Sequence, residues 1–257
     1  MNYGLYLSAN GITSSQHRMN VLANNLANAN TTAFKPSAVV LGERGREPQQ
    51  LNTLTNSTRL LDQLGGGTKI AYTGLDLSQG SVENTGIRTN LAIKGPGFLH
   101  LDGGRNETQN LTRDGNLVFD PSGILRHQAS GNAVLDERGN QIQLDTEEQR
   151  RFNGFGPHGE LIDSGDPFSP FAKVALVDAP DQSLIPRGQN LIETRESLEN
   201  AGEAEVVGSA LEQSAANPIS GMVELIELTR QIEMNSRMIQ YQDAMIGQAV
   251  TALARVV

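Results

Sequence analysis

The residue types that most often carry chemistry are spread thinly along this chain. The four histidines stand far apart, and none has a second histidine three or four residues away, as a helical zinc site requires. Two acidic pairs lie in polar stretches and are interpreted as solvated loop charges rather than as acid and base partners. The chain has no cysteine, which excludes disulfides, thiolate metal sites and cysteine nucleophiles. The histidines are His17, His100, His127 and His158, and the acidic pairs are Glu147-Glu148 and Asp163/Asp166.

Two glycine-rich segments have the composition of nucleotide-binding loops but not their context. Gly154–Gly159 matches G-x-G-x-x-G, yet Pro157 and a turn-rich continuation leave no helix whose N-terminus could hold a phosphate. In Gly65–Lys69 the lysine does not directly follow the last glycine, as a phosphate loop needs. No G-x-S-x-G signature is present, although a Ser-His-Asp group could still be assembled in space. We expect no enzyme activity, no cofactor, no metal and no small-molecule substrate.

The amino-acid composition narrows the remaining classes of function. A chain of 257 residues with 37% hydrophobic residues, seven Phe, four Tyr and no Trp must build a mostly aliphatic core. The net charge of −9 and the scattered basic residues argue against nucleic acid as a partner. No apolar run approaches the roughly 18 residues of a membrane span, and the first residues lack the pattern of a cleaved secretory signal. A structural or interaction protein is the class that remains.

The strongest pattern is an apolar residue at every seventh position near both ends. Such a repeat keeps one stripe of a helix facing a partner, because about 3.5 residues per turn is close to the natural value of about 3.6. In the first helix Leu22 takes the second seam position. In the last helix Thr229, Ser236 and Asp243 interrupt that position, so a strict zipper is not expected. The seven-spaced residues are Leu5, Ile12, Met19 and Leu26, followed by Leu225, Ile232, Ile239, Ile246 and Leu253.

The two helices have recognisable limits. The first is expected from about Tyr3 to Asn28, where several asparagines suit a helix end. The last is expected from Asn217-Pro218 to about Arg255, because Asn caps helices and Pro fits their first turn. One stripe alone would suit an ordinary core helix, whereas two stripes of common period at opposite ends of a β-rich chain favour assembly with other helices.

Between the helices the sequence predicts strands. From residue 75 to about 199, short apolar runs alternate with turn signals such as Asp120–Gly123, which indicates an antiparallel sheet or barrel. We expect an α+β fold whose long terminal helices pair as a coiled-coil-like axial domain, with a separate all-β domain formed by the central part of the chain. The expected parts are an N-terminal axial helix (1–35), an extended connector (36–74) with at most a short helix near Thr58–Leu64, a β-rich outer domain (75–205), and a C-terminal axial helix (206–257) that pairs with 1–35.

Three segments at the beginning, middle and end of the chain carry motifs in a fixed order. They are Ala23–Lys35, then Asn90–Phe98 with Thr112–Gly115, and then Leu211–Ser214, Asn217-Pro218 and Arg230–Asn235. They resemble the A-N-N-L-A-N-x-x-T-x-G-F-K, D-x-A-I-x-G-x-G-F, T-R-D-G, L-E-x-S-N-V-x-P and R-x-x-E-M-N elements of bacterial flagellar rod and hook proteins. The chain departs from these patterns at Ala33, where the family has Gly, which is favoured at positive φ, and at Asn90, Leu111 and Ala215-Ala216.

The resemblance implies a structural subunit of the flagellar basal-body rod. It implies helical assembly with copies of itself and with other rod and hook axial proteins, export through the flagellar type III apparatus without a cleaved signal, and a place in the periplasmic rod. The seven-spaced residues and Leu22 would form the assembly interface. The motif residues expected to matter are Asn24, Asn25, Leu26, Ala27, Asn28, Thr32, Phe34, Lys35, Glu233 and Asn235.

Two alternatives stay open. The length, the opening Asn2–Tyr6 and the Asn217-Pro218 helix start look more like proximal-rod members of the family than distal-rod or hook-type members. A different class would be a secreted oligomeric binding or adaptor module, in which the β domain recognises a ligand and the helices only oligomerise it. Removing either terminal helix separates these classes, because a module would still bind its ligand.

Overall fold

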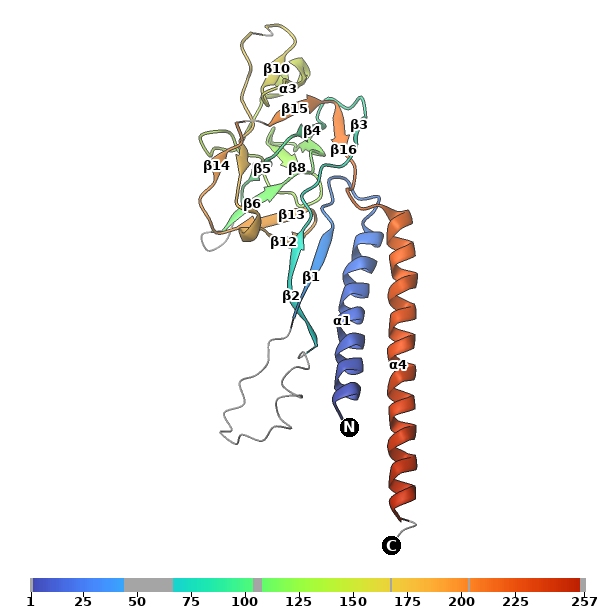
Figure 1. Ribbon diagram of the computed structural model, residues 1–257. Coiled ribbons are helices and arrows are strands. Elements are labelled where there is room, and N and C mark those ends of the chain that lie inside the picture. The colour runs from blue at the N-terminus through green and yellow to red at the C-terminus, as the bar shows by residue number, and fades with distance from the viewer. Residues whose placement is uncertain (1, 44–66, 104–107, 167, 203, 255–257) are drawn as a thin grey trace. The chain divides into compact units, whose positions relative to one another are not determined.

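The computed structural model describes residues 2–43, 67–103, 108–166, 168–202 and 204–254 (Figure 1). The chain forms two compact units. The helical unit contains Met1–Ala27, Ser37–Gly74 and Pro218–Val257, and the β unit contains Asn28–Pro36 and Leu75–Asn217. Long helices at both ends with antiparallel strands between them confirm the expected α+β class.

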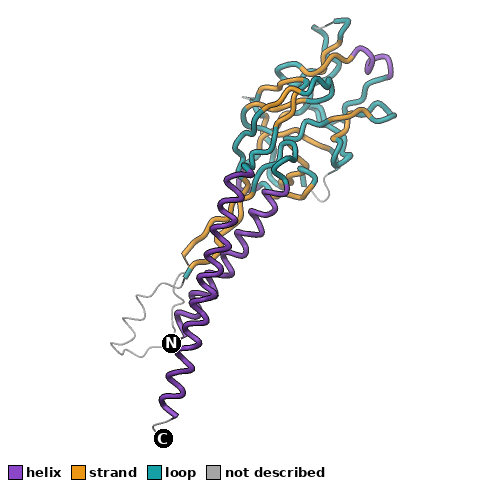
Figure 2. Tube along the Cα trace, turned by 90° about the vertical axis from the view of Figure 1, so that its right-hand side faces the viewer, coloured by secondary structure: helices purple, strands orange, loops and turns teal. Residues whose placement is uncertain are grey.

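Two long helices dominate the helical unit. Helix α1 spans Asn2–Ala27 over 26 residues, and α4 spans Pro218–Ala254 over 37 residues. They lie side by side in both views and run antiparallel, with Gly4 against Gln242 and Gly221 against Leu22 (Figures 1 and 2). Proline opens α4 as expected, since its missing N–H is no loss in the first turn of a helix.

A two-stranded sheet accompanies α1 in the same unit. Strand β1 (Ser37–Glu43) pairs with β2 (Thr68–Leu75), and β1 contacts α1. We expected an extended connector here, and the described ends of that segment instead form paired strands. Two strands alone are marginally stable in water, so the contact with α1 supports them. The short helix expected near Thr58–Leu64 lies outside the described residues.

The β unit is built from short strands, and every strand pair in it is antiparallel. Among the described residues its strands form one six-stranded sheet in the order β12-β13-β6-β5-β11-β14 and four two-stranded sheets, β10-β9, β15-β4, β16-β3 and β7-β8. The elements are β3 (Val82–Asn84), β4 (Leu91–Lys94), β5 (Phe98–Leu101), β6 (Gln109–Thr112), β7 (Leu117–Phe119), β8 (Leu125–His127), α3 (Thr146–Arg151), β9 (Phe152–Phe155), β10 (Leu161–Asp163), β11 (Leu176–Asp178), η1 (Asp181–Ser183), β12 (Ile185–Gly188), β13 (Leu191–Thr194), β14 (Glu199–Asn200), β15 (Glu205–Gly208) and β16 (Ala210–Glu212).

The six-stranded sheet is open, so the barrel that we considered is not formed in the described residues. Its edges are β12, which contains Pro186, and the two-residue β14, and proline and short length are both typical of edge strands. Two clusters of buried side chains form the core of the unit. The larger one includes Leu91, Ile93 and Leu125, all at 0% exposure, and is mostly aliphatic as the composition predicts.

Candidate functional site

The seven-spaced residues lie where the two helices of the helical unit meet. All of those whose side chains are described are half-buried, and Leu228 beside them is fully buried. The half-buried set is Leu5, Ile12, Met19, Leu22 and Leu26 in α1, and Leu225, Ile232, Ile239 and Ile246 in α4. Leu253 belongs to α4, but its side chain lies outside the described residues. Their place against the partner helix is what a helix seam requires.

The second seam row of α4 differs from our prediction by one residue. We expected Thr229, Ser236 and Asp243 in that row, and two of these, Thr229 and Asp243, are exposed. The inward row is Leu228, Asn235, Gln242 and Ala249, all buried or half-buried. Asn235, a motif residue, therefore faces α1, whereas its motif neighbour Glu233 is exposed. The error arose because a spacing of three and a spacing of four both suit a helix stripe.

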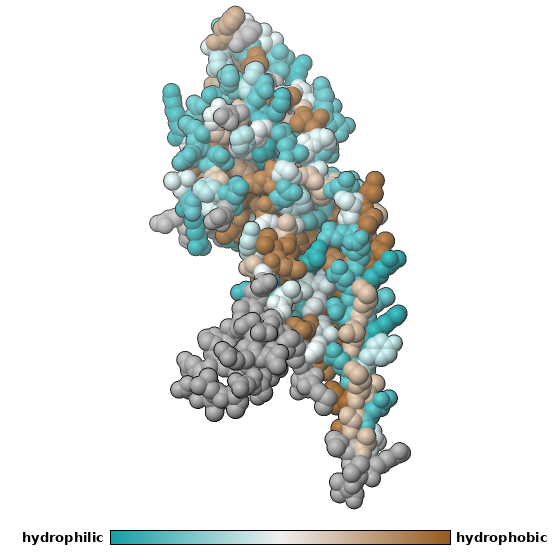
Figure 3. Space-filling view, in the orientation of Figure 1, coloured by the Kyte–Doolittle hydropathy of each residue, from teal (hydrophilic) through white to brown (hydrophobic). Residues whose placement is uncertain are grey.

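The outward surface of α4 carries an apolar band, which we call the outer stripe. Its members are all more than half exposed, from 52% at Ile226 to 76% at Ile219. Figure 3 shows apolar side chains along this helix. The outer stripe consists of Ile219, Met222, Val223, Ile226, Met234, Met238, Tyr241 and Met245. So many large apolar side chains exposed along one helix indicate a protein contact.

The end of α1 is tied to β1 by an asparagine of the first motif. Asn25 Nδ2 donates to the carbonyl of Ser37 at 2.8 Å, and the Ser37 N–H donates to Asn25 Oδ1 at 2.9 Å. The amide thus imitates one step of a strand ladder. Asn24 and Ala27 are exposed on α1, and Leu26 is half-buried. Asn25 is therefore the motif residue that holds the chain as it leaves the helix.

The rest of the first motif belongs to the β unit, where backbone contacts hold it. The Ala33 N–H donates to the carbonyl of Glu212 at 2.8 Å, and the Ala215 N–H donates to the carbonyl of Phe34 at 3.1 Å. Asn190 Nδ2 donates to the carbonyl of Thr32 at 2.8 Å. Ala33 has a φ of 51°, the left-handed conformation that favours glycine, so the turn expected from the family pattern forms with alanine.

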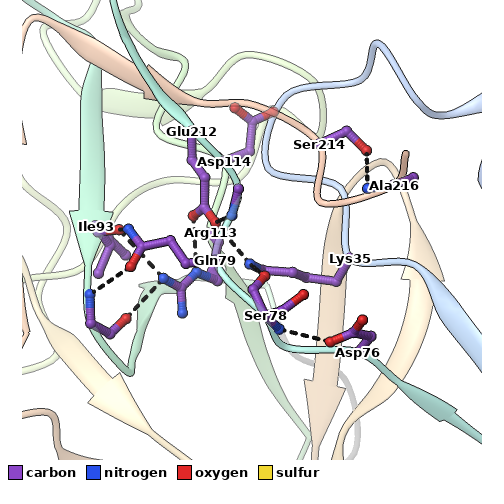
Figure 4. Close-up of polar contacts among 12 residues, drawn as sticks. Lys35, Asp76, Ser78, Gln79, Ile93, Arg113, Asp114, Glu212, Ser214 and Ala216 are labelled. Atoms are coloured by element: carbon purple, nitrogen blue, oxygen red, sulfur yellow. Dashed lines mark hydrogen bonds and ion pairs between the residues drawn. The ribbon is translucent and has the colours of Figure 1, made fainter. Parts of the chain in front are cut away.

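Three motifs meet in a buried ion network around Glu212, whose side chain is 0% exposed (Figure 4). Lys35 Nζ lies 2.8 Å from Glu212 Oε1, and Arg113 Nε lies 3.1 Å from Glu212 Oε2. Lys35 comes from the first motif, Arg113 from T-R-D-G, and Glu212 from L-E-x-S. One carboxylate therefore joins the segment that follows α1 to the segment that precedes α4.

Backbone groups complete the hydrogen bonding of this network. Lys35 Nζ also donates to the carbonyl of Ser78 at 2.6 Å, and Arg113 Nη2 donates to the carbonyl of Gly95 at 2.9 Å. The Gly80 N–H donates to Glu212 Oε1 at 2.9 Å. Burial lowers the pKa of Lys35 more than its contact with Glu212 raises it. A buried carboxylate with two cations and a backbone donor is paired as burial demands.

A second buried cluster lies beside this network. Asp114 Oδ2 lies 3.3 Å from His127 Nε2 and accepts from Asn190 Nδ2 at 3.1 Å. His127 Nδ1 lies 2.8 Å from Ser130 Oγ, so a Ser-His-Asp set does come together in space. Burial would raise the pKa of Asp114, but the contacts with His127, Asn190 and the Asn116 N–H together lower it.

This Ser-His-Asp set does not have the arrangement of a hydrolase. The serine lies on Nδ1 of His127 and the aspartate on Nε2, the reverse of a catalytic triad. His127 is 0% exposed, so no substrate reaches its ring. Ser130 Oγ also accepts the Asn132 N–H within the same turn. The set is a structural cluster.

The other chemical candidates are structural as well. Gly154–Gly159 covers the end of β9 and the turn to β10, and Gly159 has a φ of 83° in that turn. Glu147 pairs with Arg150 at 3.0 Å, and Asp163 pairs with Arg151 at 3.1 Å. The described residues contain no group of three or more side chains placed to hold a metal ion. Within the same residues, no helix has the length and hydropathy to cross a bilayer.

From sequence we did not predict a site role for Glu212, Arg113, Asp114 or Asn190. The first three stand inside the family motifs, but nothing in the local sequence indicates their partners. Lys35 and Glu212 are separated by 177 positions, and Arg113 and Glu212 by 99. The only signal was that three motifs each carry a charged residue of the type that pairs when buried.

Comparison with known proteins gives two family matches, one at each end. Residues 5–35 match the model described as flagella basal body rod protein, and residues 207–252 match that of the flagellar basal body rod FlgEFG protein C-terminal region. Lys35 falls in the first match and Glu212 in the second. The outer stripe overlaps the second match from Ile219 to Met245.

Whole-chain relatives carry similar descriptions. The flagellar basal-body rod protein FlgF of Caulobacter vibrioides is 28% identical over 263 residues, covering 100% of both chains. The flagellar basal-body rod protein FlgG of Borreliella burgdorferi is 28% identical over 97% of this chain and 98% of its own. The flagellar hook protein FlgE of Helicobacter mustelae is 36% identical, but over only 47% of this chain and 28% of its own.

Proposed function

We propose that this chain, a member of the flagellar basal-body rod protein family and a structural axial subunit of the flagellum, builds the proximal rod. In this proposal the subunits polymerise helically through their terminal helices. The observation that supports polymerisation is the outer stripe of α4. Its exposed Ile, Val, Met and Tyr side chains are too many for a helix that works alone in water.

The seam and the outer stripe have different roles in this proposal. The seam residues, such as Ile232 and Ile239, face α1 of the same chain and hold the pair together. The outer stripe faces away from this pair and is available to helices of neighbouring subunits. Burying one Met or Ile side chain stabilises a contact by roughly 1.5–3 kcal/mol, so a few such contacts per neighbour give a cohesive tube.

The sharpest test places charge on the outer stripe without disturbing the seam. In Met238→Glu/Met245→Glu, two carboxylates would have to be buried between subunits, and we expect loss of rods and of motility. The matched control is Gln16→Glu/Asn20→Glu, which adds the same number of charges to exposed positions of α1, outside the outer stripe. Wild-type motility in the Met variant, at normal subunit level, would rule out the outer stripe as the polymerising surface.

The proximal position rests on the end-to-end match with FlgF and on the opening Asn2–Tyr6 and Asn217-Pro218. The FlgG relative has the same 28% identity, so a distal-rod position is the alternative, and the local match to FlgE extends it to hook-type proteins. The position of the subunit in the rod decides between them. We expect tagged subunits to lie at the membrane-proximal end of purified rods, whereas a position at the far end of the rod or in the hook would favour one of the alternatives.

The partners in this proposal are copies of the chain, other rod and hook axial proteins, and the flagellar type III export apparatus. Passage through that apparatus needs no cleaved signal and leads to the periplasmic part of the rod. Mass spectrometry of subunits from purified basal bodies tests this. A subunit whose first residue is Met1 or Asn2 agrees with the proposal, and a start at a later residue contradicts it.

A further inference from the structure

The row of α4 residues that faces α1 contains both apolar and amide side chains. Asn235 and Gln242 stand between Leu228 and Ala249 in its second position, so two amides interrupt an otherwise apolar stripe. Leucine at both places would bury more apolar area and hold the helices together more strongly. The two amides therefore have a role other than strengthening the contact between α1 and α4.

Each amide lies over a glycine of α1. A Cβ on Gly11 would lie 2.9 Å from Asn235 Nδ2, and a Cβ on Gly4 would lie 2.6 Å from Gln242 Nε2. Both separations are below van der Waals contact, so a residue with a side chain would displace the amide. The glycines are one heptad apart in α1 and the amides one heptad apart in α4. The result is two matched pairs along one antiparallel seam.

If α4 shifted by one heptad along α1 in either direction, one of the two amides would no longer lie over a glycine. In one direction Asn235 would face Arg18, whose guanidinium lies 2.8 Å from Glu224 in the observed alignment. In the other direction Gly11 would face Leu228. Of these three alignments, only the observed one gives both amides a glycine.

The seam also contains a polar atom that costs stability. Gln242 Oε1 is buried and has no hydrogen-bond partner within the described part of the chain. The nearby Ser8 and Ser15 of α1 are buried as well. Leaving a buried amide atom unpaired costs free energy, and polar seam residues that fix alignment at such a cost are well attested in coiled coils.

We propose that Asn235 and Gln242, seated over Gly11 and Gly4, set the antiparallel register of α1 against α4. They act as positioning residues, because they choose one alignment among several that the seven-residue repeat of Leu and Ile would allow. The inference stands on the geometry of the helical unit and does not depend on how subunits assemble.

The test measures the register directly in the dilute full-length chain. The chain has no cysteine, so spin labels attach only at Asn20→Cys and Asp243→Cys, two exposed positions on α1 and α4. A one-heptad slip moves these labels by about 10 Å along the helix axis, which electron–electron double resonance resolves. The distances are compared among the labelled parent, Asn235→Leu/Gln242→Leu, and the control Gln240→Leu/Gln248→Leu, which adds two leucines at exposed positions.

We expect one narrow distance in the parent and in the control, and a second distance, displaced by about 10 Å, in the Asn235→Leu/Gln242→Leu chain. Leucine favours helix, so circular dichroism should show no loss of helix in either variant. A single unchanged distance in Asn235→Leu/Gln242→Leu would overturn the proposal. So would a parent that already shows several distances, because its amides would then not be selecting one register.

Discussion

Glu212 is the residue on which the packing of three motifs depends. Lys35 and Arg113 are almost fully buried, and both form an ion pair with this one carboxylate. Removing one partner of a buried ion pair leaves an uncompensated charge in the interior, which costs far more than the pair contributes. The network is thus a condition for folding of the β unit rather than a source of extra stability.

We expect Glu212→Gln to lower the free energy of unfolding of the β unit by about 3–5 kcal/mol. The matched control is Glu205→Gln, because Glu205 lies 3.9 Å from Lys94 with both side chains more than half exposed, and such pairs contribute about 0–1 kcal/mol. Urea unfolding followed by near-ultraviolet circular dichroism of phenylalanine measures both. Equal effects of the two substitutions would show that the buried network carries no special cost.

Asp114 should make the β unit sensitive to acid. Its pKa in the folded state is lowered, so its contribution to stability is complete above the ordinary aspartate pKa of about 3.9 and is lost as the pH falls through the folded value. We expect Asp114→Asn to reduce the free energy of unfolding at pH 7, and the difference from the parent to shrink below about pH 4. Urea titrations at several pH values measure this difference. A gap that stays constant with pH would contradict the assigned shift.

At this scale the sequence indicated which segments matter but not how they pair. Lys35 was selected as a motif residue, and Glu212 stood in a recognised motif without a role. Charged residues far apart in sequence give no local sign of being buried together. Ala33 departs from the glycine of the family pattern, which put the local turn geometry in question, and the alanine nevertheless adopts the left-handed conformation.

Among the elements of the β unit, one five-residue turn occurs three times. In Asp120–Ile124, Asp136–Asn140 and Gly156–Glu160, the first N–H donates to the last carbonyl and the fourth N–H donates to the first carbonyl. The fourth residue is always a glycine of similar φ: Gly123 at 83°, Gly139 at 81° and Gly159 at 83°. The G-x-G-x-x-G match is therefore explained by a repeated hairpin turn that contains glycine for its backbone conformation.

The third copy lacks the aspartate of the other two. Asp120 and Asp136 accept backbone N–H groups of their own turns, whereas in the third copy Glu160 Oε2 accepts the His158 N–H at 3.1 Å. We expect Gly156→Asn to raise the free energy of unfolding by about 0.5–1 kcal/mol, because asparagine favours such turns and restricts the unfolded chain. Thermal unfolding measures the gain. A loss would mean that the Glu160 side chain, 2.7 Å from the new Cβ, does not move aside.

Long periodic helices were the elements best predicted from sequence. Both limits of α1 lie within one residue of the expected Tyr3 and Asn28, because apolar periodicity, asparagines and a following proline agree there. Strand β2 was missed because its side chains are mostly exposed, and β1 because its short apolar run, Ala38–Leu41, stands alone in a polar stretch. The second seam row of α4 was missed because Asn235 and Gln242 are polar, although they face the partner helix.

Over the whole molecule, the aromatic residues are divided between the two units. The four tyrosines, Tyr3, Tyr6, Tyr72 and Tyr241, belong to the helical unit, and the seven phenylalanines, Phe34, Phe98, Phe119, Phe152, Phe155, Phe168 and Phe171, belong to the β unit. Tyrosine fluorescence therefore reports only the helices and their two-stranded sheet, and phenylalanine circular dichroism only the β unit. The chain carries its own probes for asking whether the units unfold separately.

Ile232→Asp uses these probes to test whether helix pairing and β-unit folding are separate requirements. Ile232 is half-buried against α1, and an unpaired carboxylate there is costly. We expect the tyrosine signal to unfold at lower urea, because the free energy of unfolding of the helical unit falls by several kcal/mol. The phenylalanine transition should stay in place, and rods should be absent from cells. Thr229→Asp places the same charge at an exposed position one turn away and should change none of the three. If both transitions moved together, the units would fold as one. If rods formed normally in the Ile232 variant, the helix pair would not be what subunits need in order to assemble.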